Sequence, residues 1–163
     1  MILVWSFKDD MIKKKLDNIF DDNMVIPLLY FSIEEGWLPV SVVIGGISGI
    51  GSVIAKHLAN RGDKVYTISR GDSTSKNHIS CDVSSDCTSI IDRITGIDYL
   101  IFAHRYRGTD WNKTFDVTVK GVDNVIKAVS NKLNKNSSVV IISSNASHFV
   151  SEEQPAEYHS SRA

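Results

Sequence analysis

Ser41-Val-Val-Ile-Gly-Gly-Ile-Ser-Gly-Ile-Gly-Ser52 is the stretch of this 163-residue chain that decides its fold. The β-branched run at 42–44 is typical of a parallel strand that is covered on both faces. Gly45, Gly49 and Gly51 follow it with the spacing G-x-x-x-G-x-G. We therefore predict a buried strand, a glycine turn and a helix that begins near Gly49.

Such a turn suits a dinucleotide, because glycines leave the backbone open to the diphosphate. A helix that starts there directs free N–H groups and the positive end of its dipole at the anion. A plain tight turn would also explain the glycines taken alone. The preceding strand and the amphipathic pattern of Val53, Ile54, His57 and Leu58 favour the nucleotide site. A triphosphate-binding loop is excluded because no lysine follows Gly51.

Strand and helix signals alternate after residue 40, which predicts an α/β fold. We expect a Rossmann-like, doubly wound parallel sheet with helices on both faces. The expected strands are 40–45, 64–69, 78–81, 97–103 and 138–143, and the expected helices are 49–61, 84–94, 113–133 and from 156 onward. Ligands of such sheets bind outside the carboxyl ends of the strands, where the strand order reverses. Residues 45–51, 104–111 and 143–147 should therefore surround one crevice.

Further landmarks follow the glycine turn in a fixed order. They are Val65–Arg70, Cys81–Val83, Phe115–Val122, Val139–Ser144 and Tyr158–Arg162. In this order and spacing the chain resembles the short-chain dehydrogenase/reductases over roughly residues 40–163. The turn has Ile44 where that family usually has Thr, and the last motif reads Tyr-x-x-x-Arg where the family has Tyr-x-x-x-Lys.

The resemblance implies hydride transfer between a nicotinamide and the carbonyl or alcohol group of a small molecule. Tyr158 takes the position of the general acid/base, and Arg162 takes the position of the lysine that assists it. The serine that positions the substrate oxygen is Ser143, Ser144 or Ser147. We choose Ser144, because it directly follows a strand and lies fourteen residues before Tyr158.

A free tyrosine titrates near ~10, so a base at neutral pH needs a shift of about three units, roughly 4 kcal/mol of cationic help. Arg162 lies on the same helix face, four residues after Tyr158. Arginine keeps the positive charge, but its planar fork is longer and does not exchange protons as an ammonium does. We therefore expect activity to be reduced.

The resemblance also implies the cofactor-binding residues: Gly45, Ile47, Ser48, Gly49, Ile50, Gly51, Arg70, Asp82, Val83 and Ala103. An acidic residue at the end of the second strand would select NAD, whereas Arg70 suits a 2′-phosphate, so NADP is favoured over NAD. A solvated loop arginine is the alternative. Asp82 either accepts a hydrogen bond from the adenine or caps the backbone before Ser84.

Several positions depart from the family pattern. Phe102-Ala-His-Arg105 stands where the family has N-N-A-G, and Thr118 stands where it has a relay Asn. The crevice gains His104, Arg105 and Arg107. These residues either bind an anion, which would be an acidic substrate or the cofactor phosphates, or they are exposed loop charges without a ligand. A non-catalytic nucleotide-binding or scaffold protein is therefore the alternative to an NADP-dependent oxidoreductase.

The two ends of the chain also differ from the family. Residues 1–39 predict a β-α-β-like extension, with strands at Ile2–Phe7 and Met24–Phe31 around a helix at Asp9–Phe20. The family continues well past its Tyr-x-x-x-Lys motif, so we expect residues 40–163 to be a partial dinucleotide-binding domain. We expect a truncated or weakly active form of such an oxidoreductase. Assembly of the chain into a homo-oligomer is a further expectation.

Composition places the chain among ordinary globular proteins, with 42% hydrophobic residues and a formal charge of −1. Neither a nucleic-acid surface nor an acidic tail is indicated. The apolar start at 1–7 is too short for a secretory signal, and no run approaches the ~20 residues that span a bilayer. Cys81 and Cys87 predict free thiols without a metal in a cytoplasmic enzyme.

Overall fold

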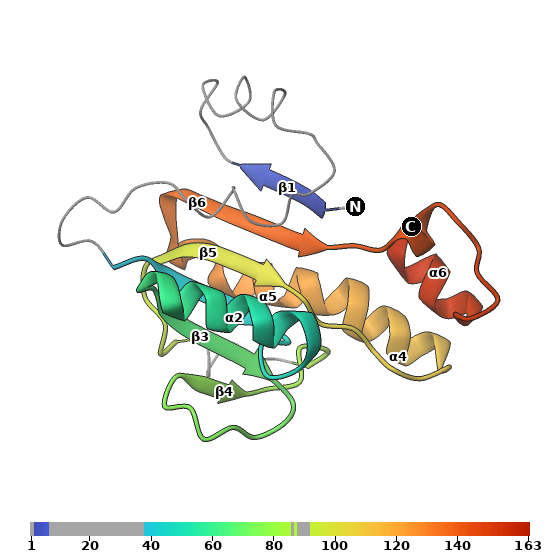
Figure 1. Ribbon diagram of the computed structural model, residues 1–163, viewed down its shortest axis with the longest axis horizontal. Helices are drawn as coiled ribbons and strands as arrows, with labels where there is room; N and C mark the ends of the chain where they lie inside the picture. The colour runs from blue at the N-terminus through green and yellow to red at the C-terminus, as the bar shows by residue number, and fades with distance from the viewer. Residues whose placement is uncertain (1, 7–37, 86, 88–91) are drawn as a thin grey trace.

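The computed structural model describes residues 2–6, 38–85, 87 and 92–163. They form one sheet with the strand order β1-β6-β5-β2-β3-β4 (Figure 1). Its strands are β1 Ile2–Ser6, β2 Val40–Ile44, β3 Lys64–Ser69, β4 His78–Ser80, β5 Ile97–Phe102 and β6 Leu133–Ile142. Strands β2–β6 pair in parallel, whereas β1 pairs antiparallel with β6 at the edge. The predicted doubly wound parallel sheet is confirmed.

Helices cover both faces of this sheet (Figure 1). They are α2 Gly49–Arg61, α4 Trp111–Phe115, the π-helical η2 Asp116–Lys120, α5 Gly121–Val129 and α6 Ala156–Arg162. Successive side chains of a strand point to opposite faces. Accordingly Val43 packs with Leu58 of α2, while Val42 and Ile44 belong to the larger core that holds Val125 of α5.

Most predicted elements are confirmed, with three differences. The helix expected at 113–133 is interrupted by η2, and β6 already begins at Leu133. The buried face of α2 is formed by Gly51, Ala55 and Leu58. Val53 is 69% exposed, so the prediction that it belongs to the apolar face of this helix was wrong. The described residues of 84–94 form turns and irregular backbone, and the rest of that predicted helix lies outside the described residues.

The predicted first strand of the extension is confirmed as β1. The helix expected at 9–20 and the strand expected at 24–31 lie outside the described residues. No described helix is long and apolar enough to cross a membrane.

Cys81 and Cys87 form a disulfide, so the prediction of free thiols was wrong. Their Cα atoms lie 6.2 Å apart, within the range that a disulfide spans. A turn brings them together: the Ser85 N–H donates to the Asp82 carbonyl at 2.9 Å. The separation of six residues between the two cysteines does not predict the disulfide, because the distance between their sulfur atoms depends on how the intervening backbone turns.

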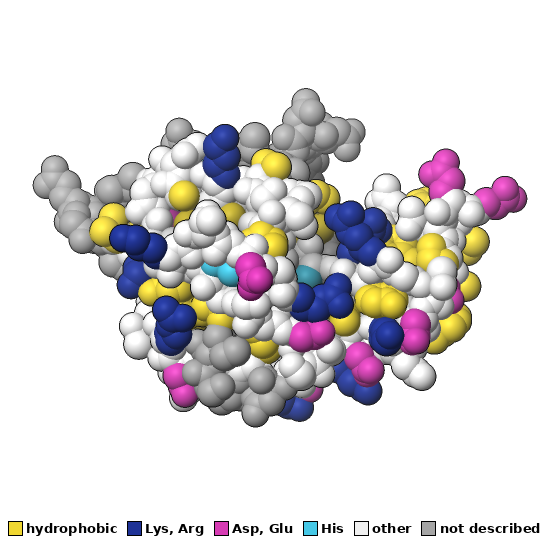
Figure 2. Space-filling view, turned by 90° about the horizontal axis from the view of Figure 1, so that it is seen from below, with side chains coloured by type: hydrophobic (Ala, Val, Ile, Leu, Met, Phe, Trp, Pro, Cys, Tyr) yellow, Lys and Arg dark blue, Asp and Glu magenta, His cyan; other side chains and the backbone are white. Residues whose placement is uncertain are grey.

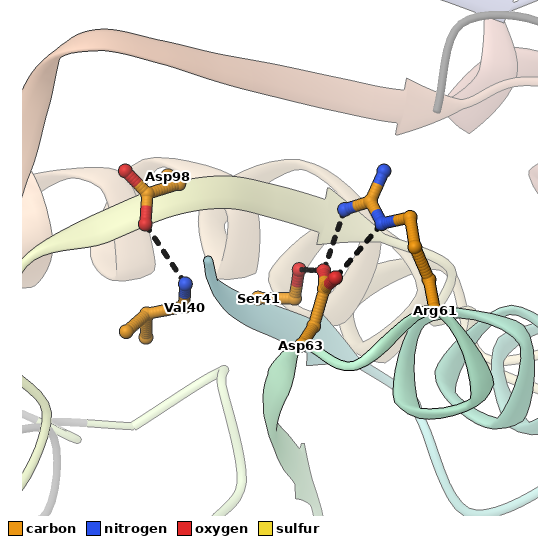
Figure 3. Close-up of polar contacts among 5 residues, drawn as sticks. All are labelled: Val40, Ser41, Arg61, Asp63 and Asp98. Atoms are coloured by element: carbon orange, nitrogen blue, oxygen red, sulfur yellow. Dashed lines mark hydrogen bonds and ion pairs between the residues drawn. The ribbon is translucent and has the colours of Figure 1, made fainter. Parts of the chain in front are cut away.

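The amino ends of the central strands are held by carboxylates (Figure 3). Asp98 of β5 accepts a hydrogen bond from the Val40 backbone N–H at 2.8 Å. Asp63 accepts from Arg61 at 2.8 and 2.6 Å and also from the Ser41 hydroxyl. The Asp63 side chain is 1% exposed, and this buried carboxylate is therefore charge-compensated where α2 returns to β3.

Candidate nucleotide-binding and active site

A cavity of about 720 Å³ lies at the carboxyl ends of β2, β3, β5 and β6. The glycine turn, the end of β3, the loop after β5 and the segment from β6 to α6 all contribute to its wall. Figure 2 shows Lys and Arg side chains gathered around the hollow between the body of the molecule and the lobe at the right of the view. The predicted convergence of these segments is confirmed.

The glycine turn is closely packed against the start of α2. Gly45 has a φ of 80°, and its N–H donates to the Ile68 carbonyl at 2.7 Å. A Cβ on Gly51 would collide with the carbonyl oxygen of Gly45 and lie 3.2 Å from the Ala103 Cβ. Ser48 precedes α2 with extended backbone and makes no side-chain capping bond. The first N–H groups of α2 thus stay available to an anion, as a diphosphate site requires.

Residues beside the end of β3 form the second part of the wall. The buried Ser69 hydroxyl has no hydrogen-bond partner among the described residues, and Arg70 next to it lines the cavity. Asp82 accepts from the Ser84 N–H at 3.0 Å and from its hydroxyl at 2.7 Å. Burial raises the pKa of Asp82, but the bonds from Ser84 and the charge of Arg70 lower it below its ordinary value. This carboxylate caps its own turn.

The remaining predicted cofactor residues also lie at the cavity. Ile47, Ser48 and Ile50 line it from the glycine turn, and Val83 and Ala103 line it from the neighbouring strand ends. The Ala103 N–H donates to the Ile44 carbonyl at 2.9 Å, which joins the ends of β5 and β2. Nine of the ten predicted residues therefore line one cavity, and the tenth, Gly51, is buried behind it in the first turn of α2.

Three serines follow β6, and they differ in their contacts. The Ser143 hydroxyl donates to the Arg162 carbonyl at 3.4 Å, and the Ser147 hydroxyl donates to the Ser144 carbonyl at 2.7 Å. Ser144 accepts from the Ala146 N–H at 3.2 Å, and hydrogen bonding by its side chain lowers the pKa of Tyr158. Among the described residues, Ser144 is thus the serine whose side chain acts on the tyrosine.

Arg162 is anchored by backbone carbonyls. Its Nη1 donates to Ile142 at 3.1 Å and its Nη2 donates to His104 at 3.3 Å, so it joins the end of β6 to the loop after β5. Its Cζ lies 5.3 Å from the centre of the Tyr158 ring. Burial lowers the pKa of Arg162, as does the charge of Arg105, although Tyr158 raises it.

Tyr158 lies between two guanidinium groups, because the Cζ of Arg105 is 5.2 Å from its ring centre. Burial raises the pKa of Tyr158. The Ser144 hydrogen bond, Arg162 and Arg105 lower it, and the net pKa lies below 10. The sequence predicted Arg162 as the cation that assists Tyr158 and assigned Ser144 to the substrate oxygen, but it did not assign Arg105 to the tyrosine; the position of Arg105 in the loop after β5, at the expected crevice, was the available signal.

The environment of His104 favours its neutral form. Its Nε2 lies 2.8 Å from the Val117 carbonyl, so this nitrogen must carry the proton and donate. The Nδ1 is buried and has no partner among the described residues. Burial lowers the pKa of His104, and Arg162 lowers it further, against the Val117 bond that raises it.

The fold is that of a Rossmann-like α/β domain. The chain matches the family model described as short chain dehydrogenase over residues 39–163, and it therefore belongs to that family. A search of curated proteins finds no significant match.

Solved structures share the fold at low sequence identity. A short chain dehydrogenase family protein from Francisella tularensis is 21% identical with a TM-score of 0.68, and the alignment covers 77% of this chain and 59% of that one. The ligand-free aldohexose dehydrogenase of Thermoplasma acidophilum is 23% identical with a TM-score of 0.66, covering 77% and 56%. Pseudomonas aeruginosa RhlG, in an NADP active-site complex, is 21% identical with a TM-score of 0.67, covering 76% and 60%. The chain thus spans less than two thirds of each of these relatives.

Proposed function

We propose that the chain is an NADP-dependent oxidoreductase that interconverts a carbonyl and an alcohol on a small molecule. The observation that carries this is the placement of Tyr158, with the guanidinium groups of Arg105 and Arg162 beside its ring, in the same cavity as the glycine turn. A lowered tyrosine pKa favours proton exchange near neutral pH.

In this proposal the bound nicotinamide supplies or accepts the hydride. Ser144 hydrogen bonds the substrate oxygen and so fixes it beside the phenol. Tyr158 gives its proton to that oxygen during reduction and takes it back during oxidation. Arg162 supplies positive charge from beneath the ring, where its bonds to Ile142 and His104 hold it.

The residues proposed to bind the cofactor come from the wall of the same cavity. The diphosphate would lie against the turn formed by Gly45, Ile47, Ser48, Gly49, Ile50 and Gly51 and face the first N–H groups of α2, with the adenosine against Arg70, Asp82, Val83 and Ala103. The buried Ser69 hydroxyl, which has no partner in the part of the chain that the structure describes, and the adjacent Arg70 fit a ribose that carries a 2′-phosphate. NADP is therefore preferred over NAD in the proposal.

A non-catalytic nucleotide-binding or scaffold protein is the second candidate. The observation that favours it is Arg162, whose two terminal nitrogens bind backbone carbonyls. A side chain committed in this way has less freedom to grip a ribose as well. The chain spans 59% and 56% of the length of two solved relatives, which is a further reason to measure turnover separately from nucleotide binding.

Fluorescence titration with NADPH and NADH, followed by a turnover assay on a panel of carbonyl compounds, tests both candidates. We expect NADPH to bind more tightly than NADH, Arg70→Gln to remove that preference, and Tyr158→Phe to abolish turnover while NADPH still binds. Tight NADPH binding without turnover on any substrate would support the scaffold. Failure of both nucleotides to bind would reject both candidates.

The location of the protein in the cell and its oligomeric state stay predictions. The Cys81–Cys87 disulfide removes the argument from free thiols for a cytoplasmic location, since thiols in the cytosol are mostly kept reduced. A small-molecule substrate and a possible homo-oligomer remain part of the proposal, and size-exclusion chromatography with light scattering tests the second.

A further inference from the structure

Two arginines reach Tyr158 from different parts of the fold. Arg162 comes from the same helix, α6, and Arg105 comes from the loop that follows β5. Their Cζ atoms lie 5.3 and 5.2 Å from the ring centre, both within the distance at which a guanidinium interacts with an aromatic ring. The proposed proton donor therefore has two cationic neighbours of nearly equal proximity.

The two cations differ in how they are held. Arg162 is half-buried and donates to the carbonyls of Ile142 and His104, so part of its charge is compensated by backbone dipoles. Arg105 is exposed and lines the cavity, and none of the salt bridges among the described residues includes it. Its charge has no carboxylate partner in the part of the chain that the structure describes.

The loop position also excludes a simple packing role. Arg105 follows His104, whose ring is tied to the Val117 carbonyl at 2.8 Å, so the backbone that carries Arg105 is fixed from below. The guanidinium extends from this fixed point over the tyrosine ring rather than into the core. An exposed arginine held over an aromatic ring at a cavity can act on that ring by charge without supporting the fold.

We propose that Arg105 is a positioning residue for Tyr158, a second cation that stabilises the phenolate formed when Tyr158 gives its proton to a substrate oxygen. This inference rests on the proposed function only in its assignment of Tyr158 as the proton donor. During reduction the O–H bond of Tyr158 breaks and an O–H bond to the substrate forms, while the hydride comes from NADPH. The negative charge left on the phenolic oxygen then faces both guanidinium groups.

The groups that face Tyr158 come from three segments. Ser144 acts from the segment after β6, Arg105 from the loop after β5, and Arg162 from α6 itself. The ring of the adjacent His159 lies edge-on at 6.4 Å between centres, and its nitrogens are engaged by backbone groups. Replacing Arg105 therefore leaves Ser144 and Arg162 in place and isolates one contribution.

Ultraviolet titration of the free protein measures this contribution without substrate or cofactor. The absorbance of phenolate near ~295 nm is followed against pH for wild type and for each variant, and the matching Tyr158→Phe protein is subtracted to isolate one tyrosine. The variants are Arg105→Gln, Arg105→Lys and, as a matched control, Arg107→Gln, which removes another exposed arginine of the same loop. Thermal melts confirm that each variant is folded.

We expect the titration midpoint of Tyr158 to move to higher pH in Arg105→Gln, and to stay near the wild-type value in Arg105→Lys and Arg107→Gln. An unchanged midpoint in Arg105→Gln would overturn the inference, as would an equal shift in Arg105→Lys, because charge would then not be the cause. Failure of the proposed function is seen separately: the midpoint would shift as expected while NADPH binding or turnover in wild type is missing.

Discussion

The two ends of the central strands handle charge in opposite ways. At the amino ends, Asp63 and Asp98 are buried and bound by donors from three elements, including Arg61 at 2.6 Å (Figure 3) and the amide of Asn134 at 2.6 Å. At the carboxyl ends, Arg105 and Arg162 face one cavity, and neither forms a salt bridge with a described carboxylate.

This difference separates stability from function within one sheet. Buried charges with partners resist unfolding, since removing one partner leaves the other uncompensated. Cations without carboxylate partners at the carboxyl ends are suited to a ligand that brings its own negative charge. Three buried polar atoms that have no partner among the described residues also lie at this end: Ser69 Oγ, His104 Nδ1 and Arg162 Nε.

The largest effect should come from breaking the amino-end network. Asp63→Ala removes the acceptor of Arg61 and of the buried Ser41 hydroxyl. We expect the free energy of unfolding in urea to fall by about 3 kcal/mol, the loss typical of breaking a buried ion pair. NADPH affinity should change little when measured where the variant is folded.

The matched control is Asp72→Ala, which removes an exposed carboxylate and should change the free energy of unfolding by less than about 0.5 kcal/mol. Equal losses in both variants would contradict the view that the amino-end network is a stability device.

Next in size is overpacking of the carboxyl-end turn. Gly51→Ala puts a Cβ against the Gly45 carbonyl and close to Ala103. We expect a loss of roughly 2 kcal/mol in the free energy of unfolding, together with weaker NADPH binding, because the turn must open. Lys56→Ala, on the exposed face of α2, is the control for urea melts and titration. Unchanged NADPH affinity in Gly51→Ala would argue against this turn as the diphosphate site.

A smaller effect should appear as pH dependence from His104. Its folded pKa lies below the ordinary value of 6.5, so below that pH the unfolded state binds more protons than the folded one. Stability contributed by neutral His104 is present above 6.5 and is lost as pH falls, by at most about 1.4 kcal/mol per pH unit. Urea melts of wild type and His104→Gln between pH 7 and 5 measure it, and parallel slopes would contradict the prediction.

The smallest effect should come from an anion at the carboxyl ends. Pyrophosphate at about three times its Kd should stabilise the protein by about 0.8 kcal/mol, whereas chloride at equal ionic strength should not. The gain should shrink in Arg107→Gln, since the Nη2 of Arg107 lies near Gly49 at the turn, 3.7 Å from where a Cβ would be. A thermal shift equal in pyrophosphate and chloride would remove the distinction between the two ends.

Sequence periodicity was sufficient for the sheet but not for details set by contacts. The β-branched runs and glycine spacing predicted β2, α2 and the cavity wall, because strand period and turn geometry are local properties. The exposed position of Val53, the interruption at η2 and the Cys81–Cys87 disulfide were missed. Each of these three features depends on the tertiary contacts of a segment with its neighbours, and a single sequence does not show those contacts.

The candidate site divides in the same way. Ser144 and Tyr158 were predicted from motif spacing, and the structure brings them together. The commitment of Arg162 to two backbone carbonyls was not predicted, nor was the approach of Arg105 to Tyr158. These contacts join residues from three separate segments.

The sequence by itself determined the family, the order of strands and helices, and the position of the glycine turn after β2, because backbone conformation and hydrophobic period act over a few residues. Only the tertiary structure decided which charges are compensated. Electrostatic partnership depends on distance through space, and Arg105 meets Tyr158 from a position that is fifty-three residues away along the chain.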